Sequence, residues 1–399
     1  MMFIEFFILG STSPIISLYL KNDLGFSGSS IGLIMAGSAL SALISPFISA
    51  FIADRLISAE RLLSIFHAAA AVVLFALFKS SAFVPVLLLY LLYWLLAGPT
   101  VALTTAITFH HAPQAAKQFG GIRLWGTLGW IGAAWAYRLL IRSPDSPGDL
   151  RNALLLGIAG SVVLMLFALT IPAGVPRQKK PIVLLPKDSL HVILNPQILL
   201  FCIIAVFVAV ADRMYVYGAA PYLKSLGVQE KNIMPLLSIG QVPEIFGLAL
   251  LGWFIMRFGI KKALLTGALL EIFRFSFFMN AVSGTALIAA ISVHGLTFAF
   301  FFTTASILLD NRSTRESRSG VHQYFGLFTG GMANLIGNTG SGFIYEKSGV
   351  SLADPSSFVI FWTVAMLLSA AGFIGILFFF REERHGGTAT QSTPPPTLK

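Results

Sequence analysis

The sequence predicts an all-α polytopic membrane protein with twelve transmembrane helices in two six-helix bundles. Two features of the composition indicate this class. Hydrophobic residues make up 56% of the 399 residues and charged residues only 11%, whereas a soluble domain carries about 25% charged residues. Because one span takes roughly 20 apolar residues, twelve spans use about 240 residues and leave room only for short connections.

Hydropathy and a central polar stretch divide the chain into two halves of six spans. We expect an N-terminal bundle at 1–172, a cytoplasmic central loop at 173–196, a C-terminal bundle at 197–380 and a disordered cytoplasmic tail at 381–399, where the sequence becomes polar and Pro-rich. The apolar runs place the spans at 2–20, 29–53, 61–79, 83–108, 119–141, 151–172, 197–223, 232–256, 262–280, 284–309, 319–345 and 357–380.

The basic residues indicate the orientation. Sixteen Lys and Arg residues fall on the even-numbered connections and the C-terminus, eight fall on the odd-numbered connections, and three lie inside spans. Because cytoplasmic loops are enriched in Lys and Arg, both termini and the central loop should be cytoplasmic. The net charge of +10 is spread over the ends of the spans, so we expect membrane lipids and no nucleic acid as partners.

Other function classes find little support in the sequence. The single cysteine, Cys202, excludes a disulfide framework and a cysteine-based metal cluster. The sequence has no Gly-Lys-Ser/Thr phosphate loop, so ATP hydrolysis is not expected to drive the protein. No nucleophile–base or metal constellation stands out. We therefore expect a protein that is not an enzyme and that uses no cofactor and no metal.

Ionisable residues inside the apolar runs are the main functional candidates. Each costs about 2.5–3.5 kcal/mol at the centre of a spanning helix on insertion scales, and such residues normally face a bundle interior or an aqueous cavity. Four acids and three bases share this position: Glu5, Arg123, Asp212, Arg213, Glu244, Glu271 and Arg274.

Span eight presents an amide and a carboxylate on one face. Gln241 and Glu244 are three residues apart and therefore neighbours on a helix. Pro243 removes a backbone donor and can kink the helix there. This arrangement is typical of a substrate site, although Glu244 could also be a structural carboxylate that a neighbouring helix satisfies.

Span five combines a cation, a hydroxyl and an aromatic ring on one face, because Arg123, Thr127 and Trp130 follow the i, i+4, i+7 spacing. This set suits a polar molecule that contains a ring. The alternative is that Arg123 extends to the cytoplasmic headgroups.

Spans seven, nine and ten carry further candidates. Asp212 and Arg213 are adjacent and diverge by about 100°, so one should face the cavity and the other a helix neighbour. Glu271 and Arg274 can form an i, i+3 pair, which could be purely structural. His294 could be a cavity ligand or a proton-binding group.

Several motifs resemble the nucleoside:proton symporter family of the major facilitator superfamily. The resemblance occurs in both halves, in the same order, and extends over essentially the whole chain. Its segments are Ser30-Ile31-Gly32, Ile52 to Ala59 with His67, Ile122 to Gly129, Gln241 to Glu244, Arg257 to Lys262 and Arg274-Phe275.

The resemblance implies two six-helix bundles around a central cavity that opens alternately to each side. It also implies substrate contacts at Arg123, Thr127, Trp130, Gln241, Glu244 and Phe298. The sequence departs from the family at two places. Where the family has an acid after the span-ten aromatic residue, this chain has Ala299. The polar pair that the family has on span seven is not clearly reproduced.

These observations lead to one main hypothesis and two alternatives. We expect a monomeric transporter of a bacterial inner membrane that imports a small polar solute, a nucleoside first, together with protons. Glu244 and then Asp212 are the expected proton carriers, and Asp54-Arg55 in a cytoplasmic turn is the expected conformational latch. The alternatives are a facilitator for sugars, aromatic acids or drugs, and a membrane receptor that transports nothing.

Overall fold

A computed structural model describes residues 1–48, 57–111, 115–140, 149–172, 174, 187–280, 284–314 and 316–381. Within these ranges the helices group into twelve spans, as the sequence predicts. Asp54 and Arg55, the expected latch, lie outside the described residues, as does the tail from residue 382 onward.

The N-terminal half supplies six spans. The first is made of two helices, α1 and α2, separated at Ser13–Ile15, where Pro14 lacks a backbone donor. The helices pack with α1 against α6 and α7, and with α4 between α5 and α7. Their bounds are α1 (Met2–Thr12), α2 (Ile16–Asn22), α3 (Gly28–Ile48), α4 (Ala59–Lys79), α5 (Phe83–His111), α6 (Ala115–Leu140) and α7 (Asn152–Thr170).

The C-terminal half supplies the other six spans, built around α9, which packs against α16 and α17. Two of these spans contain π-helical turns, labelled η2 and η3. The bounds are α8 (Lys187–Leu194), α9 (Pro196–Ser225), α10 (Glu230–Ser238), α11 (Gln241–Phe258), α12 (Ile260–Met279), α13 (Gly284–Thr297), η2 (Phe298–Thr303), α14 (Thr304–Asn311), α15 (Arg318–Gly326), η3 (Leu327–Met332), α16 (Ala333–Lys347), η4 (Pro355–Phe358) and α17 (Val359–Phe379).

Two features of the structure add to the span assignment from hydropathy. The segment expected to be a central loop contains a helix, α8, whose Ser189 hydroxyl donates to the backbone oxygen of Ser317 at 2.9 Å. Eight stretches of the described residues are long and apolar enough to cross a membrane by length and composition. Others, such as α12 with Lys261, Lys262, Glu271 and Arg274, carry too many charges for that criterion.

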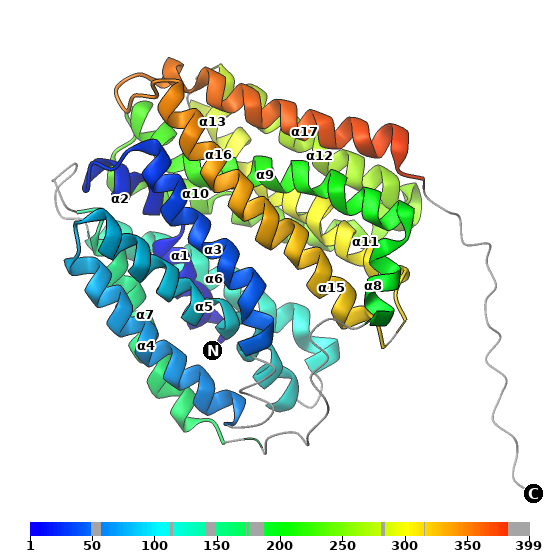
Figure 1. Cartoon of the computed structure of the whole chain (residues 1–399), viewed down its shortest axis with the longest axis horizontal. Coiled ribbons are helices and arrows are strands. Elements are labelled where there is room, and N and C mark those ends of the chain that lie inside the picture. The colour runs from blue at the N-terminus through cyan, green and yellow to red at the C-terminus, as the bar shows by residue number, and fades with distance from the viewer. Residues whose placement is uncertain are drawn as a thin grey trace, which may run out of the picture.

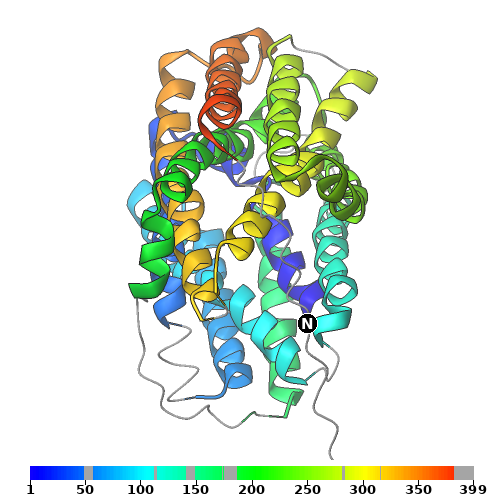
Figure 2. The same cartoon turned by 90° about the vertical axis from the view of Figure 1, so that its right-hand side faces the viewer.

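The two bundles meet along α3 and α16, which run side by side across their boundary (Figure 1). The turned view separates them as well, with the orange and red helices at the top and the light-blue and cyan helices at the bottom (Figure 2). Glycines permit the close approach: a Cβ at Gly32 would lie 2.5 Å from the backbone oxygen of Asn338.

Hydrogen bonds between the bundles cluster toward one end of the molecule. The Tyr217 hydroxyl donates to the backbone oxygen of Gly28 at 2.9 Å, and the backbone N–H of Ser29 donates to Glu346 at 2.9 Å. Asn22 donates to Glu230 at 3.2 Å, and Arg138 donates to Asn232. These contacts close the end of the protein at which α2 ends and α3 begins.

Candidate functional site

Arg123 on α6 and Glu244 on α11 bring opposite charges together from the two bundles. Both side chains are half-buried, and their charges interact electrostatically across the boundary. The Arg123 guanidinium also lies 3.9 Å from the centre of the Phe6 ring on α1, a cation–π contact that fixes its position. Two opposite charges that interrupt apolar runs of the sequence thus lie on contacting helices of opposite bundles.

A break in span eight positions the carboxylate. Helix α10 ends at Ser238 and α11 starts at Gln241, just before Pro243, so the predicted distortion is confirmed. Glu244 lies in the first turn of α11, where the positive end of the helix dipole favours a negative charge. Broken helices whose ends point into the membrane interior commonly build the substrate sites of transporters.

Close packing of α11 against α13 holds Glu244 beside span ten. A Cβ at Gly295 would lie 2.8 Å from the Cβ of Glu244, so only glycine permits this approach. Phe298 follows as the first residue of η2 and is 42% exposed. Turns of π-helix inside an α-helix occur frequently at functional sites.

The remaining expected contacts differ in accessibility. Gln241 is half-buried one turn before Glu244. Trp130 is half-buried, and a Cβ at Gly10 of α1 would lie 3.1 Å from its ring. Thr127 is buried, with 8% of its surface exposed. In this conformation, Thr127 is thus the most enclosed of the six proposed substrate contacts.

Asp212 belongs to a separate cluster of charges inside the C-terminal bundle. Its carboxylate lies 3.8 Å from Arg274 Nη2 and 3.5 Å from His294 Nδ1. Arg274 is fully buried, donates to Glu271 Oε1 at 2.7 Å and lies 4.3 Å from the centre of the Tyr215 ring. The cluster joins α9, α12 and α13.

Asp212 and Arg213 were expected to face different partners, and they also contact each other, because Arg213 Nη2 donates to Asp212 Oδ2. The long Arg side chain can fold back over one residue even though the two Cα–Cβ bonds diverge. Sequence spacing determines the directions of the Cα–Cβ bonds, but it does not determine the position of a guanidinium at the end of a flexible side chain.

A second buried cluster, which the sequence did not reveal, surrounds Glu5 in the N-terminal bundle. Glu5 is 1% exposed. Its oxygens accept from the Thr100 hydroxyl at 2.6 Å and the Thr104 hydroxyl at 3.2 Å, and lie 3.1 Å from His67 Nε2. His67 lies in the middle of an apolar helix, and this was the feature of the sequence that could have indicated a buried polar cluster. This cluster holds α1, α4 and α5 together.

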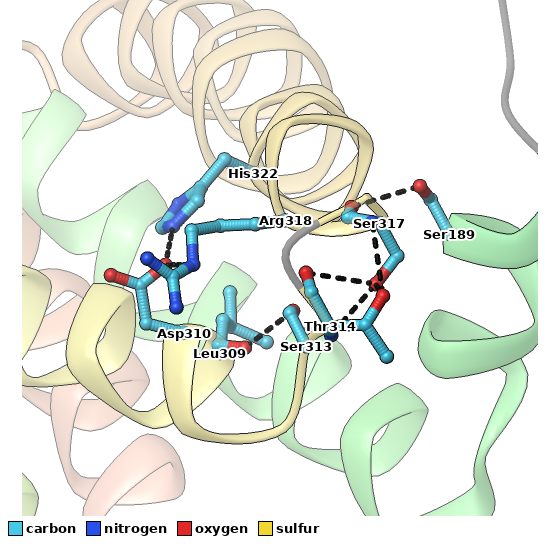
Figure 3. Close-up of polar contacts among 8 residues, drawn as sticks. All are labelled: Ser189, Leu309, Asp310, Ser313, Thr314, Ser317, Arg318 and His322. Carbon is cyan, nitrogen blue, oxygen red and sulfur yellow. Dashed lines mark hydrogen bonds and ion pairs between the residues drawn. The ribbon is translucent and has the colours of Figure 1, made fainter. Parts of the chain in front are cut away.

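A third cluster of polar residues connects spans ten and eleven at the end where α8 lies (Figure 3). Asp310 Oδ1 forms an ion pair with Arg318 Nε at 3.3 Å and lies 2.8 Å from His322 Nε2. In the turn between them, the backbone N–H of Thr314 donates to the Ser317 hydroxyl at 3.0 Å. These contacts hold α14 and α15 together, and the hydrogen bond from Ser189 to Ser317 joins their connection to α8.

Comparison with known proteins agrees with this architecture. The model of a family described as Nucleoside H+ symporter matches residues 1–385. The putative nucleoside transporter YegT of Escherichia coli K12 is 30% identical over 406 residues, which cover 98% of this chain and 94% of YegT. The xanthosine permease of the same organism is 28% identical over 411 residues, which cover 95% of this chain and 94% of the permease.

Among solved structures, the nucleoside transporter NupG superposes with a TM-score of 0.82 at 23% identity, covering 95% of this chain and 97% of that structure. A D-xylose–proton symporter superposes with a TM-score of 0.72 at 13% identity, covering 96% and 97% of the two chains. Both likenesses establish the fold. The chain belongs to the nucleoside H+ symporter family and is an integral membrane transporter of the major facilitator fold that couples nucleoside transport to protons, not an enzyme.

Proposed function

We propose that the protein imports nucleosides across a bacterial inner membrane, as a monomer, and binds them between Arg123 and Glu244. The observation that carries this proposal is the placement of these two half-buried, oppositely charged side chains on contacting helices of opposite bundles, α6 and α11. A ligand held between them contacts both halves, so its binding can control how the halves move. Charged donors and acceptors also form strong hydrogen bonds with ribose hydroxyls and ring nitrogens.

The other proposed contacts complement this pair. Gln241 supplies an amide beside Glu244, and Phe298 offers an exposed ring on which a base can stack. Trp130 provides a second ring on α6, and Thr127 provides a hydroxyl that the ligand reaches once α6 moves relative to α1. Permeases for xanthosine and other nucleosides among the relatives make a nucleoside the first choice of substrate.

The charge distribution supports an orientation with both termini in the cytoplasm, because the basic connections lie on that side. In that orientation the contacts of Tyr217, Ser29 and Glu346 close the periplasmic end. We further propose that Asp54 and Arg55 latch the cytoplasmic end in the opposite state. An Asp54→Asn variant should then transport more slowly with unchanged substrate affinity, and unaltered turnover would contradict the latch.

For the proton, the candidates within this proposal are Glu244 and Asp212. Glu244 lies at the substrate site, where a proton would directly alter its bond to the ligand. Asp212 lies deeper, in the cluster with Arg274 and His294. Either site would link protonation to a helix of the C-terminal bundle.

Substrate binding to the purified protein tests the proposal. A thermal-shift screen of nucleosides, sugars and aromatic acids should show stabilisation by nucleosides. Arg123→Ala and Glu244→Gln should weaken nucleoside binding by about 10- to 100-fold, the equivalent of one lost charge-assisted hydrogen bond. Glu316→Gln, which changes an exposed carboxylate of the same type, is the matched control.

Stabilisation by sugars or aromatic acids alone would favour the facilitator alternative. Binding without flux of any solute into proteoliposomes would favour a receptor. Full affinity in both Arg123→Ala and Glu244→Gln would place the nucleoside elsewhere and contradict the proposed site.

A further inference from the structure

The Nδ1 atom of His294 lies between a cation and an anion. It is 2.7 Å from Arg274 Nη1 and 3.5 Å from Asp212 Oδ1. These two neighbours come from different helices, since Arg274 is on α12 and Asp212 on α9, while His294 is on α13. The histidine therefore sits where three helices of the C-terminal bundle meet.

The chemistry of the partners assigns the state of the ring. A guanidinium carries only hydrogen-bond donors, so Nδ1 must accept from Arg274. His294 is then neutral in this conformation and carries its hydrogen on Nε2. A proton added at Nδ1 would fill the accepting lone pair and direct an N–H at the guanidinium, and the contact with Arg274 would break.

Asp212 is the acceptor available for that new N–H, because its Oδ1 already lies 3.5 Å from Nδ1. The other charged and titratable groups around the ring agree with this exchange. On α9 they are Arg213 and Tyr215, on α12 Glu271 and Arg274, and on α11 Glu244, which packs beside Gly295.

The charges of the cluster balance while His294 is neutral, because two carboxylates face two guanidinium groups. One added proton leaves a net positive charge, and the new bond to Asp212 partly offsets it. Arg274 keeps its 2.7 Å bond to Glu271 after it releases the ring. The proton therefore changes one hydrogen-bond partner without leaving Arg274 unpaired.

We propose that His294 and Asp212 form the proton-binding pair of the transport cycle, with Arg274 as the partner that His294 releases when the proton arrives. This inference rests on the proposed function and decides between its proton candidates. In the step, a solvent proton binds the Nδ1 lone pair, the Arg274–Nδ1 hydrogen bond breaks, and an Nδ1–H···Oδ1 bond to Asp212 forms. The side chain of His294 is 23% exposed, so the bundle does not enclose it completely.

The same helix carries the change to the substrate site. Gly295 follows His294 directly, and a Cβ there would lie 2.8 Å from the Cβ of Glu244. Such packing leaves little freedom for α13 to move toward α9 without moving the first turn of α11. Protonation of His294 thereby acts on the carboxylate proposed to bind the nucleoside.

The test compares coupled and uncoupled transport in proteoliposomes. His294→Gln keeps an oxygen that can accept from Arg274 but cannot take up a proton. We expect it to exchange internal for external nucleoside within about two-fold of the unmodified protein, a change in barrier of about 0.4 kcal/mol or less. It should lose at least about ten-fold in accumulation driven by a pH gradient, and nucleoside should no longer carry protons inward.

Two comparisons make the result specific. His191→Gln, which changes an exposed histidine on α8, should keep gradient-driven accumulation. Asp212→Asn should reduce coupling as His294→Gln does. Accumulation at the unmodified level by His294→Gln, with coupling lost in Glu244→Gln or Glu271→Gln instead, would overturn the assignment and leave nucleoside transport itself intact.

Loss of exchange together with accumulation in His294→Gln would also contradict the inference, because it would make His294 a binding or structural residue. Absence of any nucleoside flux in the unmodified protein would instead refute the proposed function. The two failures are therefore distinguishable.

Discussion

Arg274 Nη1 donates to His294 Nδ1 at 2.7 Å, while Nη2 of the same guanidinium donates to Glu271 at 2.7 Å. The guanidinium of the fully buried Arg274 thus donates to a neutral imidazole through one nitrogen and to a carboxylate through the other. A charge without such partners would be costly to bury inside a membrane bundle. The relationship explains why span nine can carry two charges in its interior.

Removing the Arg while keeping the acid should be strongly destabilising. Arg274→Met leaves Glu271 buried without its partner, and we expect a loss of about 3–5 kcal/mol in stability. The double variant Glu271→Leu/Arg274→Met should recover part of this loss. Unfolding of the purified protein measures both, and an equal or larger loss in the double variant would contradict the ion-pair explanation.

The Glu5 cluster should stabilise the folded N-terminal bundle. Glu5→Ala removes the partner of His67, Thr100 and Thr104 from a buried site, which should cost about 1–3 kcal/mol per unsatisfied group. Glu5→Gln retains an acceptor and should cost less. Thermal unfolding distinguishes the two, and equal melting temperatures for Glu5→Ala and the unmodified protein would show that the cluster adds no stability.

Closure of the end that joins α3 and α16 should depend on small residues. Gly32→Val would place its first side-chain carbon 2.5 Å from the backbone oxygen of Asn338, so the two helices must separate. We expect this variant to populate a state open at that end and to transport poorly. Distances between spin labels on α3 and α16 check this, with Gly340→Val as the control, because a Cβ at Gly340 of α16 would meet nothing within 4 Å. Unchanged distances in Gly32→Val would contradict the expectation.

The contact between Ser29 and Glu346 should weaken in acid. The backbone N–H of Ser29 lowers the pKa of Glu346, which lies just beyond the predicted span, below its ordinary value. A lowered pKa means that the contact is present above the ordinary pKa and is lost as the pH falls through the lowered one. The label distance between α3 and α16 should therefore grow below about pH 4.

A Glu346→Gln variant should remove this pH dependence, because its amide does not ionise in that range. Identical acid-induced opening in the variant and the unmodified protein would assign the effect to other groups.

The sequence predicted most of the fold because apolar length and charge placement determine the spans. It also predicted the distortion before Pro243 and the Glu271–Arg274 pair, since both depend on neighbours within one helix. Long-range partners were beyond its reach. His67 lies 62 residues from Glu5, and His294 lies 20 residues from Arg274, so only the packing of whole helices brings these pairs together.

The same distinction applies to the substrate site. Arg123 and Glu244 could be selected from the sequence because each charge interrupts an apolar run. Their placement on contacting helices of the two bundles depends on how the halves dock, which no local pattern encodes. The helix inside the central loop, α8, was missed because its amphipathic pattern spans only eight residues.

The most direct test of the account is nucleoside accumulation in proteoliposomes that contain only this protein and a pH gradient, acidic outside. The account predicts that labelled nucleoside concentrates inside, that an internal pH indicator reports proton entry only when nucleoside is present, and that collapsing the gradient releases the accumulated label. Equilibration of nucleoside without accumulation, at the same rate with and without the gradient, would show a uniporter and contradict proton coupling.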